Sequence, residues 1–544
     1  MRFYQHFRAS IARPALAAAA AFVFASGMAV SASGQARQGQ VPVAPLPQEP
    51  ASVANGTPLS MDEAVRMALE NNLGVQAERL NPEIQTFAFA RANAAYVPNL
   101  ISQFSRGSSA TPPTDFLSAG VAVVTSGSLF TQGGVQQQMR WGGGSYQVTL
   151  DGSRGTSDAP RTTYPLSLRS NLSAGINQPL LRNFKIDSLR LNLRQTRIQQ
   201  SITDLQLTQH VTQTARNVRA AYYNLVGAIS GLQVAQQSLD LSRESLKNNR
   251  TRVEVGTMAP IDIVSAEAEV ASNEEAVIIQ EAAIQSAEDQ LRTLIMNPSQ
   301  PGFWNSVFKP VDEPTMVPKA IDVDGAVKHA LQNRTDILQL KQQIASTEVS
   351  LKYAENQKLP GVDLQARYGA TGVGGTQYQY DNVAIAGGAP PIPTSTSVRS
   401  FGDVLRDVFG NNFRTWSVLV NVSYPIGTSP ADALAAQSRV QRKQEDTNLT
   451  ELEMNVTSAV RDAARQVNTN LKRVEATRKA RDLAQQRLDA ENKRFTVGLS
   501  STFELVQAQR DLASAKQREL LATIDYNVSL VNFEAIQIAP VNGR

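Results

Sequence analysis

Two passages of this 544-residue chain repeat one pattern 242 positions apart, and this repetition limits the possible folds more than any other feature. The first, RVEVGTMAPIDIVSAEAEVASNEEA, begins at Arg252, and the second, RFTVGLSSTFELVQAQRDLASAKQRE, begins at Arg494. Each contains a Val-Gly pair, a short uncharged stretch, an acidic residue and an alanine-rich segment. Because solenoid repeats are only about 20–50 residues long, we interpret the chain as one large unit used twice.

Two further pairs of passages support a tandem duplication. MDEAVRMALENNLGV resembles VDGAVKHALQNRTDI, and GINQPLLRN resembles NVSYPIGTS. The associated prolines are 262 positions apart for Pro98 and Pro360, and 246 apart for Pro179 and Pro425. We therefore predict a first repeat over residues 59–296, a linker over 297–320, a second repeat over 321–538 and a C-terminal tail over 539–544.

A long proline-free run in each repeat predicts a helix hairpin. Apolar residues recur at alternating steps of four and three over about 189–249 and again over about 431–493, which is coiled-coil spacing. Each run ends at a Val-Gly pair, since glycine adopts the left-handed conformation of a helix C-terminus most easily. A returning helix then begins near Asp262 or Glu504, because acids favour a helix N-terminus.

The uncharged residues at the two hairpin tips predict contact with a partner. They are Val255, Gly256, Thr257 and Met258 in the first tip, and Val497, Gly498, Leu499 and Ser500 in the second. An exposed turn usually carries charged residues. The alternative is that both tips are only well-capped turns, which would explain the glycine and the acid but not the uncharged stretch between them.

Four segments predict strands of a membrane barrel. They are YVPNLISQFSRGSS, LSLRSNLSAGINQP, LPGVDLQARYGATG and WSVLVNVSYP, and each alternates apolar and polar residues. Pro98, Pro179, Pro360 and Pro425 lie at their ends, where proline stops a ladder. The segment 120–156 suggests a hairpin turning at Gly142–Gly144, as two more strands or as part of an extracellular loop. Four strands cannot close a barrel of about eight or more, so we predict that several copies close it together.

The N-terminus predicts export. Residues 1–36 have a basic start, an apolar run and small residues, as in a secretory signal peptide, although an N-terminal membrane anchor is the alternative. Residues 37–58 form a proline-rich spacer. Beyond the signal, no apolar stretch of about 20 residues is present, so a mature chain that crosses a membrane must do so as a barrel.

Composition argues against several functional classes. The net charge is +4, mostly from the predicted signal, so no basic surface predicts nucleic-acid binding. Without cysteine the chain has no disulfide and no lipidated cysteine. No group of histidines and acids has metal-ligand spacing, and no glycine-rich phosphate loop is present. We therefore expect no metal, no cofactor and no enzymatic activity.

Taken in order, these features resemble the outer membrane efflux protein family, the TolC-like exit ducts. VGLS at Val497–Ser500 matches the family's tip motif, VGTM at Val255–Met258 matches it loosely, and INQPLLR and VSYPIG match its strand–helix joints. The resemblance covers about residues 59–538. It implies a mostly α protein with a β-barrel part, built as a homotrimer whose 12-stranded barrel continues into an α-helical tunnel.

The resemblance also implies a function and partners. The chain would be the outer-membrane exit duct of a tripartite efflux or type I secretion system, with its tunnel in the periplasm and outer-membrane lipid around its barrel. The tips would dock to a periplasmic adaptor, which couples to an inner-membrane pump. Asp262 and Glu504 would form an acidic aperture, weakened because Gln507 stands where the family often has another acid. A periplasmic coiled-coil scaffold without a channel is the alternative, and the substrate class, whether drug, metal or protein, stays open.

Overall fold

A computed structural model of the protein describes residues 56–113, 121–160, 162–314, 317–380 and 393–541. All of them belong to one unit, residues 51–544. The predicted signal peptide, residues 1–36, lies outside the described residues, as does the spacer as far as residue 55.

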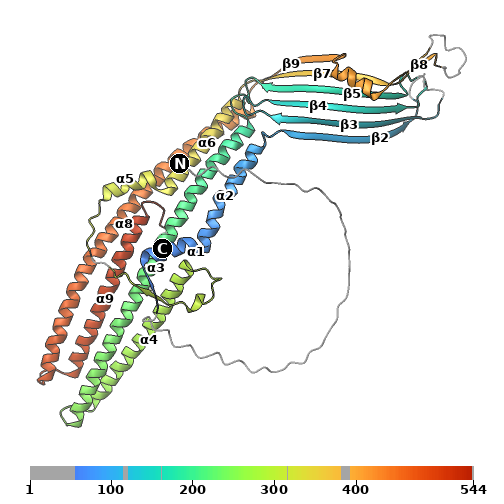
Figure 1. Ribbon diagram of the computed structural model, residues 1–544. Helices are drawn as coiled ribbons and strands as arrows, with labels where there is room; N and C mark the ends of the chain where they lie inside the picture. The colour runs from blue at the N-terminus through green and yellow to red at the C-terminus, as the bar shows by residue number, and fades with distance from the viewer. Residues whose placement is uncertain (1–55, 114–120, 161, 315–316, 381–392, 542–544) are drawn as a thin grey trace, which may run out of the picture. The chain divides into compact units, whose positions relative to one another are not determined.

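The two halves of the chain run through the same order of elements (Figure 1). The first half contains α1 (Met61–Asn71), α2 (Leu73–Ala94), β2 (Asn99–Thr111), β5 (Leu166–Pro179), α3 (Ser188–Glu254) and α4 (Ile261–Ile295). The second half contains α5 (Val323–Asn333), α6 (Thr335–Gln357), β7 (Gly361–Gln379), β9 (Arg414–Ser423), α8 (Pro430–Thr496) and α9 (Thr502–Ala535). The helices α3 and α8 each contain 67 residues, so the predicted long hairpins are present in both halves.

The halves differ in what connects their two long strands. In the first half the connection contains β3 (Val124–Gln138) and β4 (Ser145–Ser157), and in the second it contains the short β8 (Ser395–Arg399) and the helix α7 (Phe401–Phe409). The segment 120–156 is therefore a hairpin of the sheet. It turns at Gly142 and Gly143, whose φ angles of 65° and 67° favour glycine.

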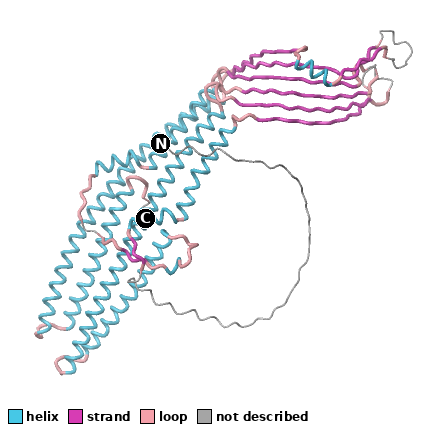
Figure 2. The backbone as a smooth tube through the Cα atoms, viewed as in Figure 1, coloured by secondary structure: helices cyan, strands magenta, loops and turns pink. Residues whose placement is uncertain are grey.

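One sheet contains all the strands from β2 to β9 except the short β6 (Figure 2). Its antiparallel order is β2-β3-β4-β5-β7, and the far edge of β7 pairs with β9 along one part and with β8 along another. The predicted number of four strands is wrong, because six long strands and β8 lie in this sheet. Glycine and serine interrupt the alternation of apolar residues in VTSGSLFTQGGVQQQ, so β3 has little of the periodic signal that identified the other strands.

The hairpins are held together by buried apolar side chains. The helix α3 packs on α4 through Val218, Tyr222 and Leu225, which meet Leu291 and Ile295. The Tyr222 hydroxyl donates to the Leu59 carbonyl oxygen at 3.0 Å, at the end of β1 (Thr57–Leu59).

The predicted linker, residues 297–320, contains regular structure. It includes the short 3-10 helix η2 (Phe303–Asn305) and β6 (Phe308–Pro310), which pairs in parallel with β1. None of the helices in the described ranges is both long and apolar enough to cross a membrane.

Candidate functional site

The two hairpin tips have the same backbone geometry. Gly256 and Gly498 have φ angles of 75° and 77°, and a Cβ atom added to either would meet nothing within 4 Å. Glycine is therefore favoured at both positions because the backbone has a positive φ angle, and not because neighbouring atoms exclude a side chain. The apolar side chains beside these glycines face solvent, and Leu499 is 79% exposed.

Three of the eight predicted tip residues make side-chain contacts inside the chain. The Thr257 hydroxyl donates to the Arg252 carbonyl oxygen at 3.0 Å. Met258 packs against the apolar cluster around Leu505 and Leu512, and the Ser500 hydroxyl donates to Glu504 at 2.9 Å and also to Glu491. Val255, Val497 and Leu499 are the tip residues that expose large apolar side chains.

A contact that the sequence did not predict joins the two tips. The Arg252 guanidinium lies 4.4 Å from the centre of the Phe495 ring, and its Nη1 donates to the Phe495 carbonyl oxygen at 3.3 Å. Arg252 belongs to the last turn of α3, and Phe495 to the last turn of α8. The first and second hairpins are therefore in contact in the last helical turn before each tip.

The two acids predicted to form an aperture have different surroundings. The Glu504 backbone N–H donates to the Ser501 hydroxyl at 3.3 Å, and its carboxylate accepts from the Ser501 N–H at 3.4 Å. This is a capping box, so Glu504 stabilises the start of α9. Asp262 lies in the first turn of α4, whose N-cap residue Pro260 makes no side-chain capping bond.

An ion pair with a buried carboxylate and a half-exposed guanidinium, further along the hairpins, was also missed. Glu269 on α4 has only 7% of its side chain exposed, and its carboxylate lies 2.5 Å from a guanidinium nitrogen of Arg510 on α9. The hydrogen bond from Arg510 to Glu269 raises the pKa of that guanidinium. The pair lines a cavity of about 250 Å³ between the hairpins. Charge pairs 241 positions apart leave no local pattern in a sequence.

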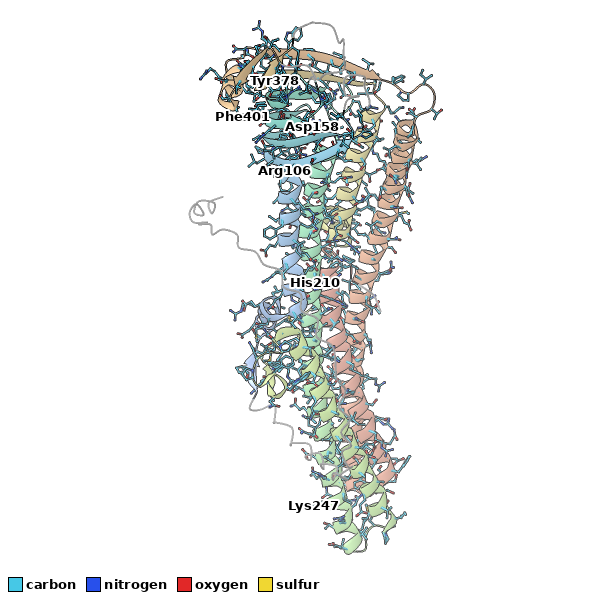
Figure 3. All side chains as sticks on the ribbon, turned by 90° about the vertical axis from the view of Figure 1, so that its right-hand side faces the viewer. Arg106, Asp158, His210, Lys247, Tyr378 and Phe401 are labelled. Carbon is cyan, nitrogen blue, oxygen red and sulfur yellow. The ribbon has the colours of Figure 1, made fainter. Side chains whose placement is uncertain are left out.

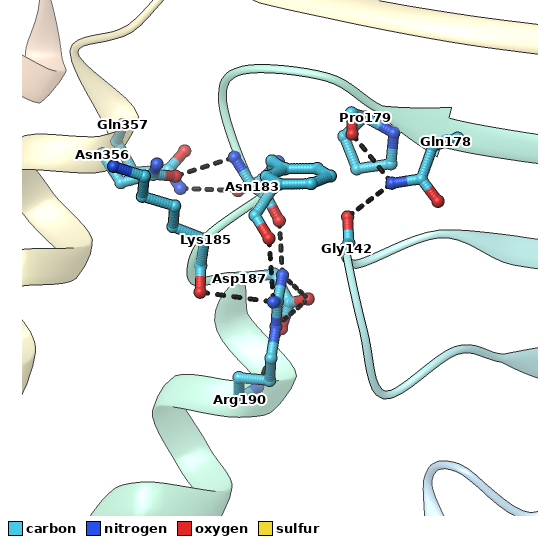
Figure 4. A network of polar contacts seen from close by, with 10 residues as sticks. Gly142, Gln178, Pro179, Asn183, Lys185, Asp187, Arg190, Asn356 and Gln357 are labelled. Carbon is cyan, nitrogen blue, oxygen red and sulfur yellow. Dashed lines mark hydrogen bonds and ion pairs between the residues drawn. The ribbon is translucent and has the colours of Figure 1, made fainter.

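The strand–helix joints carry a dense polar network (Figure 4). At the end of β5, the Gln178 amide donates to the Gly142 carbonyl at 2.8 Å, which ties the β3–β4 turn to this joint. At the start of α3, Arg190 pairs with Asp187 at 2.8 Å and donates to the Asn183 carbonyl. These contacts hold the chain where it changes from strand to helix.

The same joint receives contacts from the second half of the chain. The Asn183 backbone N–H donates to the Asn356 side chain at 2.7 Å, and the Gln357 amide donates to the Asn183 side chain at 2.6 Å. Pro98 and Pro360 directly precede β2 and β7, Pro179 ends β5, and Pro425 follows β9. The predicted joint prolines therefore all lie at strand ends.

The register of the sheet separates an apolar face from a polar face. Residues that pair across neighbouring strands point to the same side. The apolar face carries Leu100, Phe104, Val135, Val148, Leu150, Leu168, Leu172, Ile176, Leu364, Trp416, Val418, Val420 and Val422. The polar face carries Gln103, Gln132, Gln136, Gln147, Asp151, Arg169, Asn171, Gln365, Arg367, Thr371, Ser417 and Asn421.

Known proteins match both the sequence and the fold. Outer membrane protein TolC of Escherichia coli (strain K12) is 25% identical over 329 residues, which are 59% of this chain and 60% of TolC, so the match spans less than two thirds of that relative. The solved structure of CusC gives a TM-score of 0.60 at 14% identity, covering 88% of this chain and 92% of CusC. VceC from Vibrio cholerae gives 0.59 at 12% identity, covering 88% and 96%.

A family pattern settles the relationship. The pattern described as outer membrane efflux protein matches residues 146–296 and 326–536, which is more than half of the chain. The matched ranges include β4 from its second residue onward, β5, β7, β9 and all four long helices of the two hairpins. This chain therefore belongs to the outer membrane efflux protein family.

Proposed function

We propose that three copies of this chain form an outer-membrane exit duct for a tripartite efflux or type I secretion system. The two-faced sheet is the observation that carries the proposal. An apolar face with Val418, Val420 and Val422 suits lipid, whereas a polar face with Gln365 and Arg367 suits a water-filled lumen. A periplasmic scaffold without a channel has no use for a sheet with a broad exposed apolar face opposite a polar one.

The free edges of the sheet support assembly from several copies. Among the residues that the structure describes, β2 and β9 each pair on only one side. An unpaired strand edge is not tolerated in lipid, because its backbone groups find no hydrogen-bond partner there. Pairing β9 of one copy with β2 of the next closes the barrel. Three copies, the number implied by the family, then contribute 18 long strands and not the 12 that the resemblance implies, because the described part of each chain has six.

The hairpin tips are the proposed docking surface for a periplasmic adaptor. Leu499 and its neighbours Val497 and Val255 present uncharged side chains to solvent beside the two tip glycines. Apolar exposed patches of this kind mark interaction sites. The adaptor would couple the duct to an inner-membrane pump.

The acids behind the tips are the proposed aperture. In a trimer, three copies of Glu504 and three of Asp262 would approach one another at the periplasmic mouth of the tunnel. Negative charge in a narrow mouth concentrates cations. The capping box of Glu504 is compatible with this role, since its carboxylate remains part of the ring while it caps α9.

Two measurements on the same preparation test the proposed function. Outer-membrane fractions separated by density should contain the protein, and detergent-extracted protein should form ion-conducting channels in planar bilayers. Recovery of the protein only from the soluble periplasmic fraction, with no conductance, would favour the scaffold instead.

A further inference from the structure

We infer that an arginine collar on the apolar face of the sheet, formed by Arg106, Arg154 and Arg414, binds phosphate-bearing headgroups of outer-leaflet lipid. The inference rests on the proposed insertion of this sheet into the outer membrane. It adds a lipid-binding site that the exit-duct function does not itself require.

The register places the three arginines on the apolar face. Arg106 of β2 pairs with Leu129 of β3, and Leu129 pairs with Arg154 of β4, so all three side chains point to one side. Arg414 of β9 pairs with Ala370 of β7, which pairs with Leu172 of β5. The arginines are therefore on the side that would face lipid, where an isolated charge is costly unless it reaches the interface.

Their distance from the strand–helix joints puts them near the outer boundary of an apolar band. Arg154 lies nine residues after Ser145, the first residue of β4, and Arg414 lies nine residues before Ser423, the last residue of β9. At about 3.3 Å per residue and a tilt of about 35–45°, nine residues rise roughly 21–24 Å, close to the roughly 25 Å height of the apolar band of a membrane barrel.

Arg106 lies seven residues after Asn99, so its backbone reaches a height of roughly 16–19 Å by the same estimate. The long arginine side chain can extend from there to the outer boundary of the apolar band.

The charges of the collar are free to bind an anion. All three side chains belong to exposed residues, and within the described ranges none of them forms an ion pair. By contrast, Arg399 and Arg406, which lie on or beside α7, pair with Asp407 and Asp403.

Arg106 and Arg154 share a recess. Its volume is about 770 Å³, and Phe104 and Leu129 also line it. Asp158, which Figure 3 labels together with Arg106, is the acid that lines this recess. One of its carboxylate oxygens accepts from the Thr125 N–H at 2.6 Å. Two cations with apolar neighbours match a lipid phosphate above its acyl chains.

The helix α7 lies on the same face, farther from the joints than Arg414. A Cβ atom on Gly372 would come within 2.3 Å of the Val404 carbonyl oxygen, and one on Gly374 within 2.6 Å of the Val404 side chain. Glycine at these two positions therefore lets α7 pack closely on the sheet.

The helix has a buried apolar side and exposed aromatic side chains. Val404 and Val408 are buried, whereas Phe401 and Phe409 are exposed. An amphipathic helix with exposed aromatic side chains is typical of the membrane interface. A Cβ atom on Gly152, two residues before Arg154, would come within 3.2 Å of the Phe401 ring. The collar therefore lies next to an interfacial helix, at the level where headgroup phosphates are found.

The test uses full-length protein in nanodiscs of phosphatidylcholine containing bisphosphorylated lipid A, or lipid A stripped of both phosphates. Bound lipid A is measured after washing, by quantitative mass spectrometry. The test variant is Arg106→Gln, Arg154→Gln and Arg414→Gln together. The matched control is Arg169→Gln with Arg367→Gln, since these arginines point to the opposite, polar face.

We expect wild type and the control to retain the phosphorylated lipid at least about fivefold better than the collar variant, since each arginine near an anionic surface contributes about that factor. Removing the phosphates should abolish the difference, and lysine at the three positions should restore part of the binding. Equal retention of both lipids by the wild-type protein would overturn the inference without needing any variant. Failure of wild-type protein to enter lipid at all would instead contradict the proposed outer-membrane function.

Discussion

Arg252 and Phe495 join the ends of the two helix hairpins, with the guanidinium 4.4 Å from the ring centre. The two residues come from different repeats, 243 positions apart, and lie in the last turns of α3 and α8. This contact joins the two tips, so moving the tips apart must break it.

Replacing Arg252 by alanine should loosen the two tips without unfolding the chain. A cation–π contact at an exposed site contributes about 0.5–1 kcal/mol, so the change should be local. Spin labels at the two tips should show a broader distance distribution in Arg252→Ala, whereas Arg252→Lys should stay close to wild type. An unchanged distribution in the alanine variant would show that the contact does not hold the tips together.

A charge placed at the second tip should abolish transport while leaving the fold intact. Leu499→Asp would bury an unpaired carboxylate against a docked partner, which costs several kcal/mol. Gly498→Arg adds a charge at a φ of 77° that also disfavours a side chain. Export by cells carrying the variants is the measurement, with protein level in the outer membrane as the check on folding.

The matched control for the tip is Leu483→Asp, because Leu483 is also an exposed leucine of α8 and lies far from the tip in sequence. This variant should transport normally. Wild-type export by both tip variants would rule out a docking role for the tip.

Removing the two acids behind the tips should change ion selectivity more than assembly. We expect Glu504→Gln combined with Asp262→Asn to lower the cation preference of channels in planar bilayers and to weaken block by trivalent cations. Loss of the Glu504 carboxylate should also cost about 1 kcal/mol, because it closes the capping box of α9. If selectivity and block are unchanged and only stability falls, both acids are simply helix caps.

The joint after β9 should make stability depend on pH. Hydrogen bonds from Lys358 and Ser429 hold the pKa of the Asp432 carboxyl below its usual range. A lowered folded-state pKa means that the ionised carboxylate stabilises the fold above the ordinary aspartate pKa of about 3.9, and that this stabilisation is lost as pH falls through the lower folded-state value. Asp432→Asn should therefore have a lower melting temperature than wild type at pH 7, and the two should converge at strongly acidic pH. A constant difference at all pH values would contradict this assignment.

The sequence predicted the elements whose signals are periodic or repeated. The long helices follow from coiled-coil spacing ended by Gly256 and Gly498, and β2, β5, β7 and β9 follow from alternation next to proline. The hairpin of β3 and β4 has two possible interpretations in the sequence, because serine and glycine residues such as Gly133 and Gly134 interrupt its alternating pattern. The helix α7 was missed because it is only nine residues long and interrupts the second strand pair.

Some features of the candidate sites could be predicted from the sequence and others could not. The tip glycines Gly256 and Gly498 can be predicted from the sequence, since a helix commonly ends at a residue in the left-handed conformation, which glycine adopts most easily. The contacts Arg252–Phe495 and Glu269–Arg510 join residues more than 240 positions apart, so no local spacing reveals them. The faces of the sheet depend on register across six strands, and register is a property of the folded sheet.

Cysteine crosslinking between the two free edges of the sheet tests the central claim most directly, because the native chain has no cysteine. Leu419→Cys on β9 is combined in turn with single cysteines from Leu100 to Phe104 on β2, and outer membranes are oxidised before denaturing electrophoresis. Barrel closure by three copies predicts that at least one pair gives crosslinked dimers and trimers, with nothing larger and with β2 of one chain joined to β9 of the next. Crosslinking only within single chains, or a series that continues beyond three, would contradict the proposed trimeric duct.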